Sequence, residues 1–204
     1  HLPRASLRNL VIGGATLSDL NLEIIERPAE YYEDGKARKD TINKGRFVRA
    51  MEIAAKEAGH PNPKLAAAQS SWETTYGANP GGNLYGIQTQ MSKKGSGVDV
   101  KTTEERAGKK QQETQEFVNL QEAPLTKHAA LSMETLTREY PKFIEQLTSD
   151  PENVEEALKY LQATDKGGYR SLNTGYATDS NYISGVFDMY NSMDQYLTES
   201  PPPL

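Results

Sequence analysis

One glutamate of the chain stands where its carboxyl group could serve as an acid. Glu73 directly follows Trp72 and precedes Tyr76 by one helical turn, near the end of a segment rich in Ala, Leu and Ser. Apolar neighbours raise the pKa of a carboxyl group, and a protonated carboxyl can protonate the leaving oxygen of a glycosidic bond. A solvated glutamate at a helix end fits the same residues, and on these residues alone it is the more common case.

The spacing of apolar residues predicts the helices that would position Glu73. Apolar residues recur with helical spacing over 43–58, which predicts an amphipathic helix ended by Gly59. A second apolar face predicts a helix over 63–76, closed by Gly77. Glu73 then lies near the C-terminal end of this second helix, where a following loop rich in Gly, Asn and Pro can open a cleft.

The remaining chain predicts a mainly α, α+β lysozyme-like fold: a helical domain with a small β-hairpin lobe. Residues 78–118 are rich in glycine and contain short alternating runs, which are typical of an irregular β-hairpin. Helical patterns return over 125–136, 140–149, 151–162 and 180–197. Residues 1–40 are charged and weakly helical, and we expect an N-terminal extension with one helix over 17–26. Periodicity alone would also permit a plain helical bundle.

Composition excludes several classes of function. The chain has 23 basic and 28 acidic residues, a formal charge of −5 and no basic stripe, which disfavours nucleic acid and anionic membranes as partners. It contains no cysteine, so disulfides, thiol nucleophiles and thiolate metal sites are excluded. No apolar run reaches the roughly 20 residues of a membrane span. The histidines are scattered, which argues against a zinc site: His1, His60 and His128.

Two neighbouring motifs resemble a known family. Residues 68–77 read AQSSWETTYG and are similar to the AQAALESGWG motif of the glucosaminidase family, glycoside hydrolase family 73. Residues 83–88 read NLYGIQ and look like its NLFGIK element. The family includes bacterial autolysins, the flagellar cell-wall hydrolase and many phage lysins. In the family the glutamate of the first motif is the catalytic acid, and it falls on Glu73.

Two further blocks extend the resemblance, which runs in separated blocks from about 43 to 195. Residues 102–108, TTEERAG, resemble the β-lobe segment that carries the family's second carboxylate, at the position of Glu104. Residues 175–182, GYATDSNY, are close to the GYATDPxY signature, which implies a cleft hydroxyl at Tyr176. We therefore expect Glu73, Glu104 and Tyr176 to be catalytic. The residues expected to bind substrate are Trp72, Tyr76, Asn83, Tyr85 and Tyr182.

Structural roles fit several of these residues as well. Residues 83–87 can be a turn that packs the hairpin onto the helix through Leu84 and Ile87. Thr178 or Asp179 suits the N-cap of the last helix, which would make Tyr182 a core residue. Glu104 lies beside Glu105 in a polar hairpin and fits a structural role nearly as well as a catalytic one.

The chain also departs from the family pattern. Tyr76 replaces the usual Trp near the acid, and Trp72 occupies a usual Leu position. The FRxY-like element reads FVNL at 117–120, and Ser180 replaces a proline in the last signature. A poorer copy of that signature, QATD, lies at 162–165. These differences affect the details of the substrate groove and leave the acid in place.

The resemblance implies an endo-β-N-acetylglucosaminidase that hydrolyses the GlcNAc-β-1,4-MurNAc bond of peptidoglycan without a metal or organic cofactor. We expect one catalytic domain over 41–198 and the start of a proline-rich linker at 199–204. Residues 1–17 lack the pattern of a signal peptide, which favours a domain of a larger phage tail or virion-associated lysin; a flagellar or secreted autolysin ranks second. The expected partners are glycan strands and other virion or cell-wall proteins, at an extracytoplasmic site. A lytic transglycosylase and a non-catalytic virion or flagellar component remain alternatives.

Overall fold

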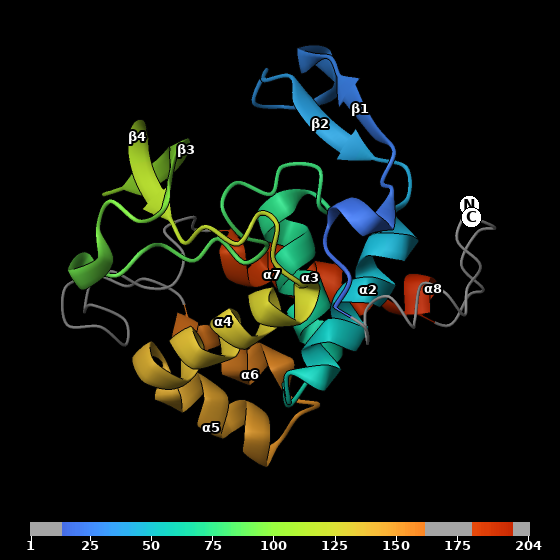
Figure 1. Cartoon of the computed structure of the whole chain (residues 1–204), viewed down its shortest axis with the longest axis vertical. Helices are drawn as coiled ribbons and strands as arrows, with labels where there is room; N and C mark the ends of the chain where they lie inside the picture. The colour runs from blue at the N-terminus through green and yellow to red at the C-terminus, as the bar shows by residue number, and fades with distance from the viewer. Residues whose placement is uncertain (1–13, 162–180, 198–204) are drawn as a thin grey trace.

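The centre of the molecule is a helix that is buried along most of its length. The computed structural model describes residues 14–161 and 181–197. Helix α3 (Pro63–Thr74) begins at Asn62, whose side chain accepts a hydrogen bond from the Leu65 amide at 3.0 Å, and proline suits the first helical position. All residues over 65–71 are buried. Helix α2 (Lys44–Glu57) packs its apolar face beside α3 (Figure 1).

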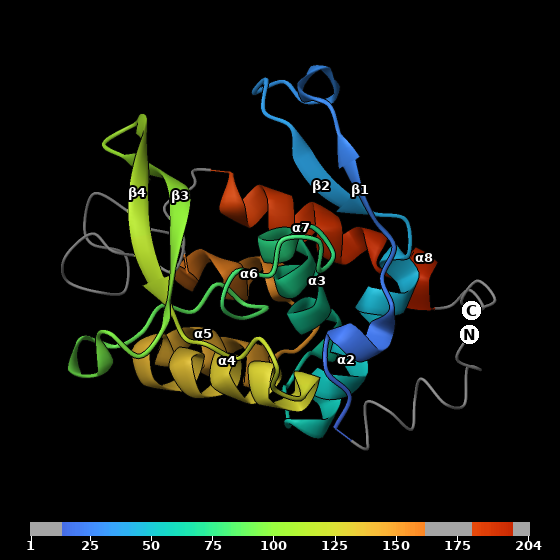
Figure 2. The ribbon, with the colours of Figure 1, turned by 45° about the horizontal axis from the view of Figure 1, so that its top comes forward.

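Two antiparallel hairpins project from the same side of the helical body (Figure 2). The first pairs β1 (Ile24–Arg27) with β2 (Arg38–Thr41), and the second pairs β3 (Val98–Arg106) with β4 (Lys109–Phe117). Ala107 and Gly108 form the turn of the second hairpin, with φ of 51° and 76°. Positive φ at both positions is what a two-residue hairpin turn requires. The hairpins touch where Lys36 Nζ donates to Thr103 Oγ1 at 3.1 Å.

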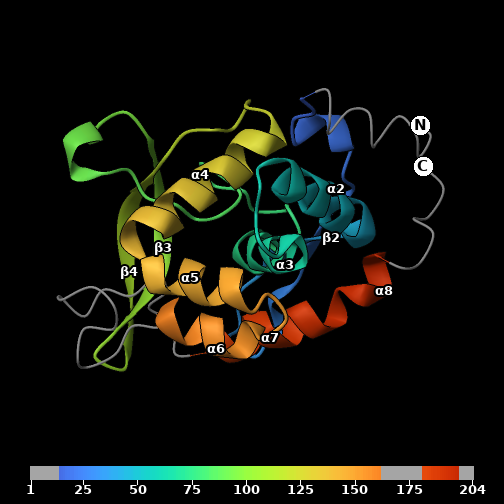
Figure 3. The ribbon, with the colours of Figure 1, turned by 90° about the horizontal axis from the view of Figure 1, so that it is seen from below.

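The remaining helices surround α3, which Figure 3 views nearly along its axis. They are α4 (Leu125–Glu139), α5 (Pro141–Ser149), α6 (Val154–Leu158) with a 3₁₀ turn (Lys159–Leu161), α7 (Tyr182–Ser192) and α8 (Asp194–Leu197). The largest fully buried side chains join these helices to α2 and α3 in one core, which includes Phe47, Met51, Leu65, Leu136, Phe143 and Leu158. The α+β lysozyme-like class predicted from the sequence is confirmed.

The helix predicted over 17–26 is wrong. Only Ser18–Leu20 form a 3₁₀ turn, and Ile24–Arg27 is a strand. This strand forms because Arg38–Thr41 offers it a hydrogen-bonding partner, with Ile24 opposite Thr41. Local periodicity carries no information about such a partner.

Other helix boundaries also differ from the prediction. Helix α3 ends at Thr74, because Thr75 and Tyr76 take left-handed φ values of 51° and 55°. The helix predicted over 151–162 is shortened to α6 and its 3₁₀ turn. The last predicted helix is divided at Met193 into α7 and α8. The first two helices are kept at a shorter length, and the third is present as two shorter helices.

Candidate active site

Glu73 is an exposed carboxylate on the last turn of a buried helix. Directly after it the chain reverses through Thr75 and Tyr76, followed by Gly77 with φ of 87°. A Cβ on Gly77 would lie 2.7 Å from the Phe47 ring, so only glycine fits this reversal. The Thr74 hydroxyl donates to the Ser70 carbonyl at 2.7 Å and accepts from the Gly77 amide at 2.8 Å. These contacts fix the helix end that presents Glu73 to solvent.

The loop 83–87 lies against the Glu73 side chain. Gly86 has φ of +65°, and a Cβ there would lie 2.8 Å from Glu73 Oε2. The loop is shaped by buried Asn83, whose Nδ2 donates to the Ile87 and Val118 carbonyls at 2.8 and 3.1 Å. Asn83 Oδ1 accepts from the Tyr85 and Ile87 amides at 3.1 and 3.0 Å. Asn83 therefore holds the loop that brings the Gly86 backbone to the carboxylate.

Trp72 and Tyr182 join the acid-bearing helix to α7. The Trp72 ring lies on Gly185, where it leaves no room for a Cβ. Tyr182 is 1% exposed, and its hydroxyl accepts a hydrogen bond from Gln69 Nε2 at 3.0 Å. Burial raises the pKa of the Tyr182 phenol, and the negative charge of Glu73 raises it further. The phenol and the Glu73 carboxylate therefore lie near one another.

Tyr76 and Tyr85 occupy two different environments. Tyr85 is buried, and burial raises the pKa of its phenol. Tyr76 is half-buried, makes an edge-on contact with Tyr196 at 5.9 Å between ring centroids, and has Lys44 Nζ 4.8 Å from its ring centroid. Of the residues expected to bind substrate, Trp72 and Tyr76 are therefore partly accessible. Asn83, Tyr85 and Tyr182 lie behind the surface, and their contact with substrate stays a prediction.

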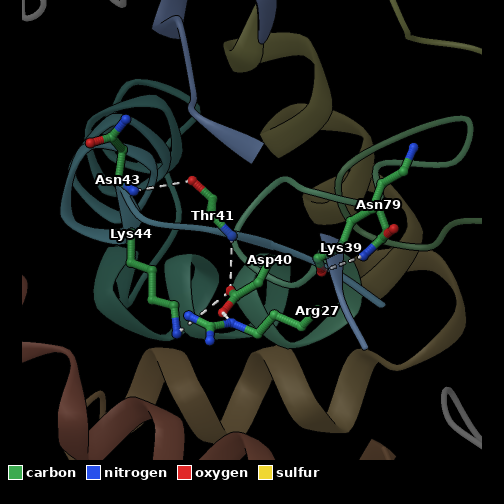
Figure 4. A network of polar contacts seen from close by, with 7 residues as sticks. All are labelled: Arg27, Lys39, Asp40, Thr41, Asn43, Lys44 and Asn79. Carbon is green, nitrogen blue, oxygen red and sulfur yellow. Dashed lines mark hydrogen bonds and ion pairs between the residues drawn. The ribbon is translucent and has the colours of Figure 1, made fainter. Parts of the chain in front are cut away.

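The foot of the first hairpin is attached beside the loop that follows α3 (Figure 4). Asp40 is 8% exposed and accepts from Arg27 Nε at 3.0 Å and from the Thr41 amide at 2.8 Å. Lys44 Nζ lies 3.7 Å from Asp40 Oδ1, the oxygen that accepts from the Thr41 amide. Asn79 Nδ2 donates to the Lys39 carbonyl at 3.2 Å. Lys44 belongs to α2 and Asn79 to the loop that follows α3, so these contacts fix the hairpin to both elements.

Glu104 comes from the second hairpin and not from the helical body. It lies opposite Gln111, near the turn, and is half-buried. On the same face Arg106 donates to both Glu113 oxygens, from Nε at 3.2 Å and Nη2 at 3.1 Å. The Arg106 guanidinium holds the pKa of Glu113 down, to about 2, and the charge of Glu104 adds to the stabilisation of Arg106. The structure therefore places the two predicted catalytic carboxylates on separate elements.

Residues 49–195 match the family model Glucosaminidase, described as mannosyl-glycoprotein endo-beta-N-acetylglucosaminidase. The chain belongs to the glucosaminidase family. It is therefore a glycoside hydrolase, and membership of the family implies that it acts on peptidoglycan. The first hairpin precedes the matched residues, whereas Glu73, loop 83–87, the second hairpin and α7 lie within them.

Solved structures share the fold of this glucosaminidase domain. A peptidoglycan hydrolase mutant from Sphingomonas sp. A1 is 21% identical over 76% of this chain and 98% of its own, with a TM-score of 0.56. An N-acetylmuramoyl-L-alanine amidase from Staphylococcus aureus is 19% identical over 81% of this chain and 47% of its own, with a TM-score of 0.54. The glycoside hydrolase domain of Salmonella typhimurium FlgJ is 21% identical over 77% and 92%, with a TM-score of 0.51. No curated protein matches the chain.

Some predicted residues of the glucosaminidase site fall outside the described residues. These are Tyr176, the predicted caps Thr178 and Asp179, Ser180, and the second motif copy at 162–165. Within 14–161 and 181–197, no group of three or more His, Cys, Asp or Glu side chains could hold a metal ion. No helix in this part of the chain is long and apolar enough to span a membrane.

Gln69 and Gly185 were missed by reasoning from the sequence. Gln69 is fully buried four residues before Glu73, within a run of small residues that is otherwise unremarkable. The available signals were its polar side chain on the buried helix and its i,i+4 spacing from the acid. Gly185 lies inside a helical pattern, and an isolated glycine there indicates close packing against a neighbour.

Proposed function

We propose that this glucosaminidase domain hydrolyses the β-1,4 bond between N-acetylglucosamine and N-acetylmuramic acid in peptidoglycan, with Glu73 as the general acid. The observation that carries the proposal is the position of Glu73 in the family motif. It is an exposed carboxylate at the end of a buried helix, with the Gly86 backbone against it. Such a group is reachable by a glycosidic oxygen and held by a rigid scaffold.

The other proposed roles follow the chemistry of glycosidic cleavage. Glu73 protonates the leaving oxygen while positive charge develops at the anomeric carbon. Glu104, carried by the second hairpin, activates water or stabilises that charge, and Tyr176 positions the water or the acetamido group. If the substrate's own acetamide acts as the nucleophile, Glu104 contributes less. None of these steps requires a metal or organic cofactor.

Replacement of the acid tests the proposal directly. Glu73→Gln keeps the shape of the side chain but removes its transferable proton, and we expect clearance of purified sacculi to fall by about 10² to 10⁴-fold. Glu134→Gln is the matched control, because it removes an exposed carboxylate that forms an ion pair with Arg138 on α4. Thermal melting verifies that both variants fold. Unchanged lysis by folded Glu73→Gln would refute Glu73 as the acid.

Two further variants rank the partners of Glu73. Glu104→Gln and Tyr176→Phe should each slow lysis, and Tyr176→Phe should leave binding to sacculi nearly unchanged. If Glu104→Gln leaves the rate of lysis unchanged while Tyr176→Phe lowers it strongly, the acetamide-assisted route is favoured. If both variants match the wild type, neither residue takes part in catalysis.

The product distinguishes hydrolysis from the lytic transglycosylase reaction. Water at the anomeric carbon leaves a new reducing end, whereas attack by the muramic acid 6-hydroxyl leaves a 1,6-anhydro ring. Sacculi digested by the protein and reduced with borohydride should yield N-acetylglucosaminitol ends by mass spectrometry. Anhydromuramic acid as the main product would assign the chain to the transglycosylases, and the absence of any product would assign it a binding role.

The proposed setting is the bacterial cell wall, outside the cytoplasm. Within it we place the chain first as a domain of a phage tail or virion-associated lysin, with a flagellar or secreted autolysin second. Glycan strands are the proposed substrate, and proteins of the virion or of the cell-wall machinery are the proposed partners. Lysis of intact bacteria by protein added to the medium would support an extracytoplasmic site of action.

A further inference from the structure

A buried polar pair crosses the interface between α3 and α7. Gln69 is fully buried and Tyr182 is 1% exposed, and the Gln69 amide donates to the Tyr182 hydroxyl oxygen at 3.0 Å. Gln69 precedes Glu73 by one helical turn, and side chains four residues apart on a helix are neighbours on one face. The phenol that meets Gln69 therefore lies beside the proposed acid.

The position of this phenol is fixed by the packing of the two helices. Trp72 lies directly before Glu73, and its ring lies on Gly185, one turn after Tyr182 on α7. Because Gly185 leaves no space between the ring and the α7 backbone, α7 cannot slide along α3 without a clash. Tyr182 is thus held against the acid-bearing end of α3 by the Gln69 hydrogen bond and by the Trp72–Gly185 contact one turn further along α7.

The hydrogen-bonding capacity of the Tyr182 phenol determines whether it donates or accepts beside Glu73. A tyrosine hydroxyl has one hydrogen to donate, and Gln69 Nε2 already supplies a hydrogen to its oxygen. Burial and the Glu73 charge both raise the pKa of Tyr182, so the phenol keeps its hydrogen while a carboxylate titrates. Among the described residues, Tyr140, at the junction of α4 and α5, also acts on the pKa of this phenol and raises it.

We propose that Tyr182 is a positioning residue for Glu73, held by Gln69 so that its hydroxyl donates a hydrogen bond to the Glu73 carboxylate. The proposal rests on Glu73 being the general acid. A hydrogen bond to the charged form of a carboxyl lowers its pKa and fixes its orientation. Loss of the phenol should therefore raise the pKa of Glu73 and loosen the side chain. The basic limb of the pH–activity profile, where the acid loses its proton, should then move to higher pH.

The test is Tyr182→Phe in the whole chain, with Tyr190→Phe as its matched control. Tyr190 lies on the same helix, is 7% exposed, and its phenol accepts from Asn62 Nδ2 at 3.2 Å. Both variants lose a buried phenol–amide pair, but only Tyr182 lies beside the acid. We expect Tyr182→Phe to lower kcat on sacculi by about 10-fold and to move the basic limb upward by about one pH unit. Tyr190→Phe should leave both quantities unchanged.

A second variant keeps the test valid if Tyr182→Phe does not fold. Gln69→Met removes the amide that orients the phenol and retains a similar shape, so it should shift the same limb in the same direction by a smaller amount. Profiles of the folded variants that superpose on the wild type would overturn the positioning role. An equal loss of kcat in Tyr182→Phe and Tyr190→Phe without a pH shift would also overturn it. If Glu73→Gln remains active, the proposed function itself fails, which is a separate result.

Discussion

Glu73 reaches solvent although the helix that carries it is buried over 65–71. This is possible because the chain reverses at once, through two left-handed residues and Gly77, before another turn of helix can cover the carboxylate. Left-handed conformations at Thr75 and Tyr76 each cost about 1–2 kcal/mol. Packing of Gly77 against Phe47 and the Thr74 hydrogen bonds offset that cost. The exposure of one carboxylate thus depends on several buried contacts.

Gly86→Ala should impair catalysis more than it impairs stability. The added methyl group would lie 2.8 Å from Glu73 Oε2 and would displace the carboxylate. The left-handed backbone adds a destabilisation of about 1–2 kcal/mol. We expect lysis of sacculi to fall by at least about 10-fold, because displacement of a catalytic group by about 1 Å has effects of that size or larger.

Gly35→Ala provides the control for this prediction. Gly35 has φ of +66°, nearly the value at Gly86, but a Cβ there meets no atom within 4 Å. It should lose similar stability in urea unfolding while keeping full activity. Equal activity in the two variants would mean that the contact between Gly86 and Glu73 is unimportant for catalysis.

Among the elements, α4 stabilises the loop 83–87 through a histidine. His128 is buried, and its Nδ1 accepts from the Leu84 amide at 3.1 Å. Burial lowers the pKa of His128 to about 4, below the value near 6.5 that an unfolded chain would give. The neutral ring therefore stabilises the fold fully above pH 6.5, and this stability is lost as the pH falls from 6.5 toward 4.

His128→Asn should flatten the pH dependence of stability in that window. The asparagine oxygen takes the place of Nδ1 as acceptor but does not titrate. For the wild type, the linkage relation gives a loss of about 2 kcal/mol from His128 between pH 7 and pH 5. His60, whose pKa burial also lowers to about 4, should add a similar loss that the variant retains. Urea unfolding at pH 7 and pH 5 measures the loss of stability in the wild type and in the variant. An equal loss in the two proteins would contradict the role given to His128.

The first hairpin is predicted to depend on Asp40 for its attachment. Asp40→Ala removes the acceptor shared by Arg27, Lys44 and the Thr41 amide. Because the loss leaves a partly buried Arg27 without its carboxylate, we expect hydrogen exchange to accelerate in Ile24–Arg27 and Arg38–Thr41. Exchange in β3 and β4 should not change.

Asp34→Ala is the control for this variant, since Asp34 pairs with Arg38 on the surface of the same hairpin. Surface ion pairs contribute about 0–1 kcal/mol, so exchange should change little. Equal acceleration in both variants would show that Asp40 has no special role in the attachment.

At the scale of the whole molecule, elements that leave a local pattern in the sequence were predicted. Elements that form only by pairing with a distant segment were missed. Periodic apolar residues located α2, and the Ala107–Gly108 turn lay within the hairpin lobe predicted over 78–118. The first hairpin was missed because Ile24 pairs with a strand ending at Thr41. The residues of β1 read IIER, which has no alternation of apolar and polar types, although their exposure alternates in the structure.

Some residues of the candidate site were predicted from the sequence, and others were not. The family motif identified Glu73 as the acid. A single glutamate at a helix end does not by itself indicate that role. Burial of Asn83 and Tyr85 was harder to predict, since residue type does not show which side of a loop faces the core. The burial of Tyr182 agrees with the core role that the sequence offered as the alternative to substrate binding. Gln69 was overlooked because its partner, Tyr182, is distant in the chain and comes close only when α7 packs on α3.

The contact between Trp72 and Gly185 has a spectroscopic consequence. Trp72 is the only tryptophan in the chain, so light that tyrosine does not absorb excites a single indole directly before Glu73. That indole is half-buried against α7, and its emission depends on how completely the α7 backbone shields it from water. Any event that separates α3 from α7 should shift this emission to longer wavelength. The protein therefore carries an intrinsic fluorescent reporter of its proposed active site, with no label and no engineered residue.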